Sequence, residues 1–219
     1  MKSLTRWLLV LLLPCFIATA ACAKEYTDGK EYLTLADPQP TSSQDKVEVV
    51  ELFWYGCPHC YYLDPLLDQW LASKPDDVEF IRMPAVLGPS WELYGKAYYT
   101  AEFLGVLDKV HPALFTALHQ DKKKIRDVAA LQAFFVEQGV SAEDFTKTFN
   151  SFAVNVKINN AKQMTKRYAI TGVPTIIVNG KYSTSASQAG SNEAIIKVMD
   201  YLIAGQRPQT AAAASTATR

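Results

Sequence analysis

Apolar positions change their period near residue 56, where a strand pattern gives way to a helix pattern. Residues 47–55 are rich in β-branched and aromatic side chains, which is typical of a buried strand. Residues 61–71 place apolar side chains at helical spacing, and Pro58 stands where the first helical position is expected. The sequence therefore predicts a strand-to-helix junction at residues 56–60.

Further patterns predict other strands and a last helix. Residues 32–35, before this junction, form a short apolar segment that could be an edge strand. Residues 78–83, after it, alternate apolar with charged side chains, as a half-buried strand does. Later, Asn179-Gly180 separates two strand-like segments, which is a strong hairpin signature. The predicted strands are 32–35, 78–83, 173–178 and 181–183, and the last helix is 192–204.

No convincing strand pattern occurs between about residue 88 and Gly172, where helical patterns follow one another. Ser90, Asp127 and Ser141 each stand where they can cap a following helix, and Gly139 can end one. This predicts an all-helical unit inserted into an α/β chain, with mainly a packing role and any substrate contact at its rim. The predicted helices are 91–104, 110–119, 128–138, one that begins after Ser141, and 153–168.

The first 23 residues indicate a cleavable export signal. A short basic segment precedes the apolar residues 7–17, which are too few for an ordinary membrane span. Small residues on both sides of Cys22 fit a cleavage site that would make Lys24 the first residue of the mature protein. Residues 18–20 offer a second cleavage site. An uncleaved membrane anchor is the alternative. Lipid anchoring at Cys22 is disfavoured, because Thr19 stands where that recognition usually requires a large aliphatic residue.

Cleavage would change the cysteine count and the charge. Cys15 and Cys22 would be lost with the signal, and only Cys57 and Cys60 would remain. Two such closely spaced cysteines close a loop too short to stabilise a fold much, which favours redox chemistry over a structural disulfide. The whole chain has 22 basic and 22 acidic residues, and the loss of two basic ones would give a net charge of about −2. Nothing in this balance suggests a nucleic-acid surface.

The chemistry is expected at Cys57-Pro58-His59-Cys60, a CxxC motif on the predicted junction. Cys57 falls near the N-cap, where unpaired backbone N–H groups and the positive end of the helix dipole favour a thiolate. His59 can add a donor or a positive charge near the same sulfur. The pattern therefore predicts a redox-active dithiol that needs no cofactor beyond itself.

Metal and haem sites are the alternatives for this motif. A zinc site would need further ligands, but His111 and His119 are not at finger-like spacing and no third cysteine would remain after cleavage. A c-type haem would need histidine directly after the second cysteine, where Tyr61 stands. We expect no metal.

The CPHC motif, the segment Thr171-Gly172-Val173-Pro174 before a hairpin, and the helical insertion together resemble the DsbA family of the thioredoxin superfamily. The resemblance covers nearly the whole chain after the signal, up to the last helix. It implies an α/β thioredoxin fold with an inserted all-helical domain. The expected division is 1–23 signal peptide, 24–87 first part of the thioredoxin domain, 88–152 helical insertion, 153–205 second part, and 206–219 an Ala/Thr-rich disordered tail.

The same resemblance implies roles for residues of the motif and of the loop before the hairpin. Cys57 would be the nucleophile that forms a mixed disulfide, and Cys60 would complete the redox pair. Val173 and Pro174 match a cis-proline loop that lies beside the dithiol and presents the Val173 backbone to an extended peptide. A proline here could also simply end a loop, and the sequence does not give its isomer.

Pro58, His59 and Glu51 are expected to tune the site. Glu51 matches a buried acidic residue beneath the dithiol, although a strand-edge position facing solvent is the alternative. Arg82 stands where the family has a basic residue near that carboxylate. Asp64, on the helix after the motif, is expected to be an exposed carboxylate.

The implied function is oxidation of cysteines in reduced, unfolded exported proteins in the periplasm. The implied partner is a membrane DsbB-like oxidase that passes electrons to quinone, and the protein is expected to be a monomer. One alternative is a peptide-binding chaperone or adaptor whose dithiol is incidental. Another is a disulfide isomerase, but only about 33 residues would precede Cys57 after cleavage, too few for the dimerisation domain usual in such enzymes.

Overall fold

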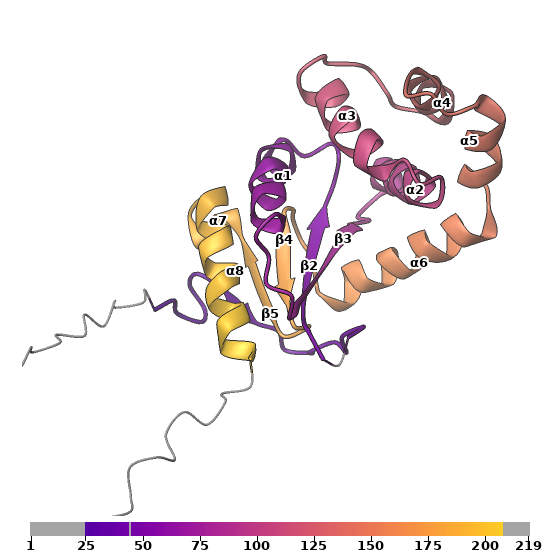
Figure 1. Cartoon of the computed structure of the whole chain (residues 1–219). Coiled ribbons are helices and arrows are strands. Elements are labelled where there is room, and N and C mark those ends of the chain that lie inside the picture. Colours follow the sequence, from indigo (N-terminus) through magenta and orange to yellow (C-terminus); the bar gives the residue numbers. More distant parts are fainter. Residues whose placement is uncertain (1–24, 44, 208–219) are drawn as a thin grey trace, which may run out of the picture.

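A computed structural model describes residues 25–43 and 45–207, and its centre is a five-stranded sheet of order β1-β5-β4-β2-β3 (Figure 1). β2 runs parallel to β3 and antiparallel to β4, and all seven of its residues are buried. The strand that leads into the CxxC motif therefore lies in the interior of the sheet. The strands are β1 (Leu33–Thr34), β2 (Val47–Phe53), β3 (Val78–Pro84), β4 (Thr175–Val178) and β5 (Tyr182–Ser185).

Helices cover both faces of the sheet. α1 (Pro58–Leu71) and α8 (Asn192–Gln206) pack together on one face, next to the short α7 (Ala186–Ala189) (Figure 1). α6 (Phe152–Arg167) packs on the other face through its C-terminal part. This confirms the expectation of an α/β fold.

The alternation of side chains along β2 decides which of its residues meets the CxxC helix. Val49 belongs to the core that β2 shares with α1 and α8, whereas Val50 and Leu52 belong to the core on the opposite face. Successive side chains of a strand point to opposite faces, so Glu51 is in phase with Val49. Glu51 therefore lies on the face covered by α1.

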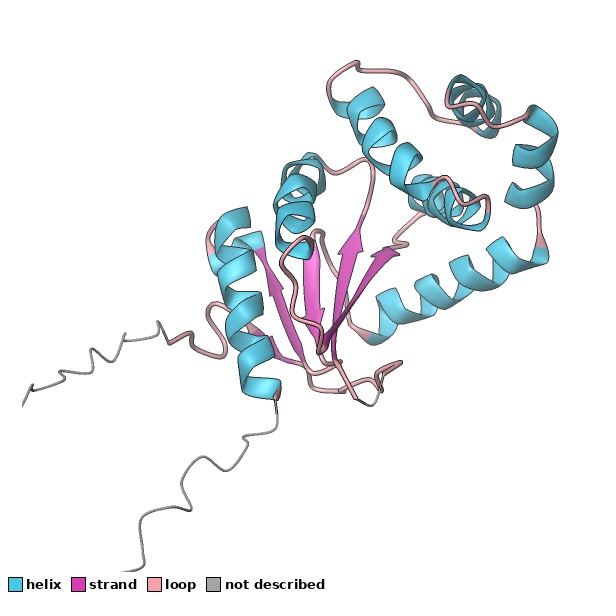
Figure 2. Ribbon diagram, in the orientation of Figure 1, coloured by secondary structure: helices cyan, strands magenta, loops and turns pink. Residues whose placement is uncertain are grey.

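The chain between β3 and β4 forms a helical unit beyond the ends of β2 and β3 (Figure 2). One continuous apolar core joins this unit to the sheet, from Phe53 and Tyr55 to Phe115, Phe135 and Phe145. The helical unit is therefore packed onto the segment that precedes the CxxC motif. Its helices are α2 (Pro89–Phe103), α3 (Leu107–His119), α4 (Val128–Glu137) and α5 (Ala142–Phe149), followed by α6.

Two of the three predicted caps of the helical unit are confirmed. Asp127 accepts a hydrogen bond from the Ala130 N–H, and Ser141 accepts one from the Asp144 N–H. The prediction for Ser90 was wrong, because Pro89 takes the first helical position and Ser90 lies within α2. The hairpin at Asn179-Gly180 is confirmed, and both turn residues have positive φ, 52° and 63°.

The C-terminal boundary of the fold lies later than predicted. Gln206 is the last residue of α8 rather than the first of a tail, and Arg207 donates two hydrogen bonds to Asp77 at 2.6 and 2.9 Å. The predicted signal peptide with Cys22, and the tail from residue 208 on, lie outside the described residues. Within residues 25–43 and 45–207, no helix combines the length and apolar character that crossing a bilayer requires.

Candidate active site

The CxxC motif occupies the junction that the sequence predicts, at the top of β2 and the start of α1. Cys57 is the N-cap of α1 with extended φ and ψ (−92° and 118°), and Pro58 follows at the first helical position. Cys60 lies in the first helical turn and is fully buried, whereas Cys57 keeps 9% of its surface exposed. Both sulfurs are free thiols, so the structure represents the reduced protein.

The two thiols differ strongly in acidity. A hydrogen bond from the Cys60 thiol is the main cause that lowers the pKa of Cys57 to about 6, against the opposing effect of burial. The backbone N–H groups of Cys60 and His59 act in the same direction, followed by the positive charge of His59. The pKa of Cys60 is raised well above its usual value, because the thiol is buried and donates to Cys57.

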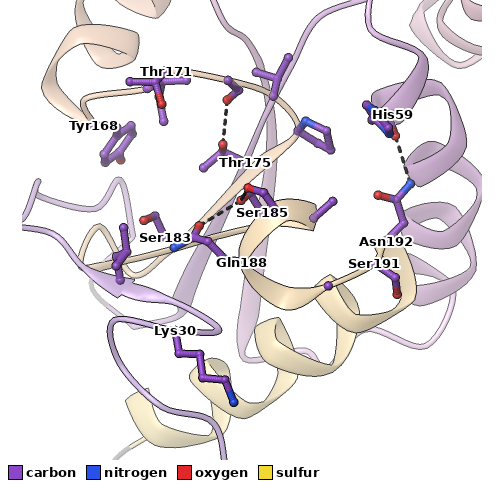
Figure 3. Close-up of a pocket in the computed structure, with 18 of the residues that line it drawn as sticks. Lys30, His59, Tyr168, Thr171, Thr175, Ser183, Ser185, Gln188, Ser191 and Asn192 are labelled. Carbon is purple, nitrogen blue, oxygen red and sulfur yellow. Dashed lines mark hydrogen bonds between the residues drawn. The ribbon is translucent and has the colours of Figure 1, made fainter.

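His59 is exposed, and its backbone ties the motif to α8. Its carbonyl oxygen accepts a hydrogen bond from the side-chain amide of Asn192 at 3.2 Å (Figure 3). The strand-to-helix turn is thus held from the C-terminal helix, 133 residues further along the chain.

The loop before β4 lies beside the dithiol. The Val173–Pro174 peptide bond is cis, and the Cys57 thiol donates to the Val173 carbonyl oxygen at 3.3 Å. An open groove of about 940 Å³ runs from His59 and this loop towards Lys30 (Figure 3). Its wall mixes apolar residues with hydroxyl and amide side chains, among them those of Thr171, Thr175, Ser183, Ser185, Gln188, Ser191 and Asn192.

Glu51 is buried beneath α1, with 2% of its surface exposed. Burial raises the pKa of its carboxyl to about 7, although the positive charge of Arg82 opposes that shift. Arg82 Nε lies 3.2 Å from Glu51 Oε2, and the two residues are register partners on β3 and β2. Of the two positions considered for Glu51, the structure has the buried one, and Arg82 stands next to it as expected.

Comparison with known proteins identifies the family. The family model of the DsbA-like thioredoxin domain matches residues 93–195. The thiol:disulfide interchange protein DsbA of Pseudomonas aeruginosa PAO1 is 43% identical over 198 residues, covering 90% of this chain and 94% of that protein. DsbA of Pseudomonas syringae pv. tomato is 42% identical, covering 90% and 92%. The chain belongs to the DsbA family.

Solved structures agree with this assignment. The crystal structure of Pseudomonas aeruginosa DsbA matches with a TM-score of 0.79 at 44% identity, covering 83% of this chain and 95% of that one. DsbA from Xylella fastidiosa matches with a TM-score of 0.77 at 34% identity, covering 83% and 98%. The fold is therefore a thioredoxin fold with a helical insertion, and the chain is a thiol:disulfide oxidoreductase. No group of three or more His, Cys, Asp or Glu side chains among the described residues could hold a metal ion.

The burial of Asp64 differs from what the sequence predicted. We expected an exposed helical carboxylate, but only 6% of Asp64 is exposed. Asp64 lies one helical turn after Cys60, on the face of α1 that meets the sheet, so its carboxylate reaches Arg82 at 3.0 Å. Arg82 also contacts Asp68, one turn further on, at 2.7 Å.

Sequence reasoning missed His111 and His119 as parts of the site. Both lie on α3, eight residues apart, and both hold Tyr55, two residues before Cys57. The Tyr55 hydroxyl lies 2.7 Å from His111 Nδ1, and the Tyr55 carbonyl oxygen lies 2.7 Å from His119 Nε2. The sequence shows two histidines on one helix, but their partner depends on how the helical unit packs onto the sheet.

Proposed function

We propose that this protein is a periplasmic dithiol oxidase that donates the Cys57–Cys60 disulfide to newly exported proteins. The observation that carries the proposal is the difference in acidity between the two sulfurs: the pKa of Cys57 is lowered to about 6, while that of Cys60 is raised. A thiolate that is stable at neutral pH is a good leaving group, so the reduced protein is favoured and the disulfide is oxidising.

The proposed reaction has two exchange steps. A client thiolate attacks Cys57 of the oxidised pair, a client–Cys57 disulfide forms, and Cys60 leaves and takes up a proton. The second client thiolate then attacks the client sulfur, the new client disulfide forms, and Cys57 leaves as a thiolate. The client loses two electrons and the Cys57–Cys60 pair gains them.

The surrounding residues support these steps. We assign Glu51 as the group that supplies the proton to Cys60, because it lies beneath α1 with a carboxyl pKa of about 7. Pro58 and His59 shape the start of the helix that stabilises the Cys57 thiolate. Val173, next to Pro174, offers its backbone to an extended client beside Cys57.

The partners and location follow from the family and the N-terminal sequence. Residues 1–23 would direct export to the periplasm, where disulfides persist. Clients would be reduced, unfolded exported proteins. Continued turnover needs an electron acceptor, which we assign to a membrane DsbB-like, quinone-linked oxidase that re-oxidises the pair. The protein would act as a monomer without a metal or organic cofactor, its redox group being the Cys57–Cys60 disulfide.

The test is the equilibrium of the purified mature protein with glutathione, together with oxidation of a synthetic peptide dithiol. We expect a reduction potential well above the value of about −270 mV typical of thioredoxin. Cys57→Ser should abolish peptide oxidation, and Cys60→Ser should retain the ability to form a mixed disulfide at Cys57. A potential at or below the thioredoxin value would make the protein a reductant, and a wild type without any exchange would favour the adaptor.

A further inference from the structure

His111 links the helical insertion to both ends of the CxxC segment. It lies on α3 with 5% of its surface exposed. Its Nδ1 is 2.7 Å from the hydroxyl of Tyr55, two residues before Cys57, and its Nε2 is 3.0 Å from Oδ1 of Asp64, four residues after Cys60. No other imidazole among the described residues contacts the carboxylates around Arg82.

One arrangement of protons satisfies all three side chains. Burial acts to raise the pKa of Asp64, but the hydrogen bond from His111 and the positive charge of Arg82 oppose it and the pKa is lowered, so Asp64 is an ionised acceptor. Burial lowers the pKa of His111, so its imidazole is neutral. Nε2 must then carry the proton that is donated to Asp64, and Nδ1 must accept the proton of the Tyr55 hydroxyl.

This arrangement matters because Arg82 is shared. Its guanidinium contacts the buried Glu51 at 3.2 Å, the buried Asp64 at 3.0 Å and the exposed Asp68 at 2.7 Å, so these carboxylates compete for one positive charge. The negative charge of Asp64 contributes to the raised pKa of Glu51. If Asp64 took the proton instead, one of the two other negative charges beside Arg82 would be lost and Glu51 would ionise more readily.

We propose that His111 is a positioning residue for disulfide exchange: by donating to Asp64, it keeps that carboxylate ionised against Arg82 and leaves Glu51 as the group that exchanges a proton with Cys60. The inference rests on the proposed function for its role in exchange, but its electrostatic premise is independent of clients. The insertion thereby sets which carboxylate carries the proton beneath the dithiol.

A cavity of about 180 Å³ at the domain junction gives solvent a route to this cluster, and His111 and Arg82 form part of its wall. The protonation of the His111 imidazole depends on every charged or titratable group packed around it. Those groups are Tyr55 after β2, Asp64 and Asp68 from α1, Arg82 from β3, Tyr98 from α2, and Asp108 from α3 itself.

The test is a titration of the Glu51 carboxyl by ¹³C NMR in the reduced mature protein, with the signal assigned by its loss in Glu51→Gln. We expect His111→Leu and Asp64→Asn each to lower the Glu51 midpoint by about one pH unit, because each removes the ionised Asp64 that competes for Arg82. The double variant should show no further shift. His111→Gln should retain most of the wild-type midpoint, because its Nε2 can still donate to Asp64.

Tyr98→Phe is the matched control. Tyr98 packs edge-on against His111 at 5.8 Å between ring centroids, and the substitution keeps its ring. Its Glu51 midpoint should match the wild type. An unchanged midpoint in folded His111→Leu, with a lowered one in Asp64→Asn, would overturn the proposal.

A measurement on the wild-type protein tests the proposed role of His111 even if His111→Leu does not fold. The ¹⁵N shifts of the His111 imidazole should show a neutral ring protonated on Nε2 throughout the Glu51 titration; a cationic ring or an Nδ1–H tautomer there would refute the proposal. Peptide oxidation distinguishes failure of the proposed function from failure of the His111 proposal. A wild type that does not oxidise a peptide dithiol would reject the proposed function. The ¹³C and ¹⁵N titrations would still test whether His111 controls the protonation of Glu51.

Discussion

The carbonyl oxygen of Val173 lies 3.3 Å from the sulfur of Cys57, although 116 positions separate the two residues in the sequence. In the reduced protein this oxygen accepts the Cys57 thiol proton. In the disulfide form, which meets clients in the proposed reaction, Cys57 has no proton to donate, so we expect the oxygen to be free to accept an N–H from an extended client chain. Under the proposed function we therefore expect oxidation of the Cys57–Cys60 pair, and not ionisation of Cys57, to free the Val173 oxygen for a client.

The acidity of Cys57 should depend mainly on Cys60. Replacing Cys60 with alanine removes the largest cause of the lowered pKa of Cys57, so the midpoint should rise from about 6 by about one pH unit or more. Cys60→Ser is the matched variant, because its hydroxyl can still donate to the thiolate, and it should shift less. Ultraviolet absorbance of the thiolate against pH measures both, and equal shifts in the two variants would contradict the assigned cause.

His59 should contribute less than Cys60. Its charge is the last of the causes that lower the pKa of Cys57, and its backbone N–H remains in any substitution. We expect His59→Ser to raise the Cys57 midpoint by less than Cys60→Ala does and to make the couple somewhat less oxidising. The same absorbance titration, with the equilibrium against glutathione, tests this; a larger effect than that of Cys60→Ala would show that the imidazolium dominates.

Reduction should stabilise the fold. Folding stabilises the Cys57 thiolate, so the folded disulfide should be more oxidising than the same pair in the unfolded chain. A difference of about 60 mV would favour the reduced native state by nearly 3 kcal/mol. Because the folded pKa of Cys57 is depressed, this advantage should be present above its unfolded pKa and should be lost as pH falls through about 6.

Equilibrium denaturation of the mature protein with and without excess reductant measures this difference, and the same experiment at acid pH provides the control. A higher midpoint for the oxidised form at neutral pH would refute the stabilised thiolate and the assignment as a disulfide donor.

Ionisation of the Glu51 carboxyl should lower the free energy of unfolding. Its pKa is raised from 4.5 to about 7 in the fold, so the folded state holds the proton more tightly than the unfolded state between these pH values. The free energy of unfolding should therefore fall as pH rises from about 4.5 to 7, by about 3 kcal/mol. Glu51→Gln should remove this dependence and be more stable than the wild type at pH 8. Urea denaturation across this range tests it, and a parallel pH dependence in wild type and variant would contradict the raised pKa.

Loss of Arg82 should destabilise the protein strongly at neutral pH. The substitution Arg82→Leu leaves Asp64 and Glu51 buried without their cation, which typically costs about 3–5 kcal/mol. The cost should shrink in acid, as the carboxylates become protonated. Arg207→Ala is the matched control, because its pair with Asp77 is solvent-exposed and should contribute far less to stability. Similar losses in the two variants by urea denaturation would show that burial of the Arg82 cluster has no energetic consequence.

The sequence by itself determined the features that depend on neighbouring residues. The change from strand to helix pattern placed Cys57 at an N-cap and Pro58 at the first helical position, because helix ends have local chemical requirements. The caps at Asp127 and Ser141 and the hairpin at Asn179-Gly180 were predicted for the same reason. Burial of Glu51 was expected from the family resemblance rather than from its strand pattern alone.

The tertiary structure decided which side chains from distant segments meet. Asp64 was expected in solvent because a carboxylate on a helix usually lies there, but α1 turns it towards Arg82 of β3. His111 and Tyr55 meet only because the helical unit packs onto the end of β2, and the Val173 carbonyl reaches Cys57 only because β4 pairs with β2. A sequence pattern reports the period and ends of each element, whereas contacts between elements depend on how their apolar faces are buried against one another, which no local pattern specifies.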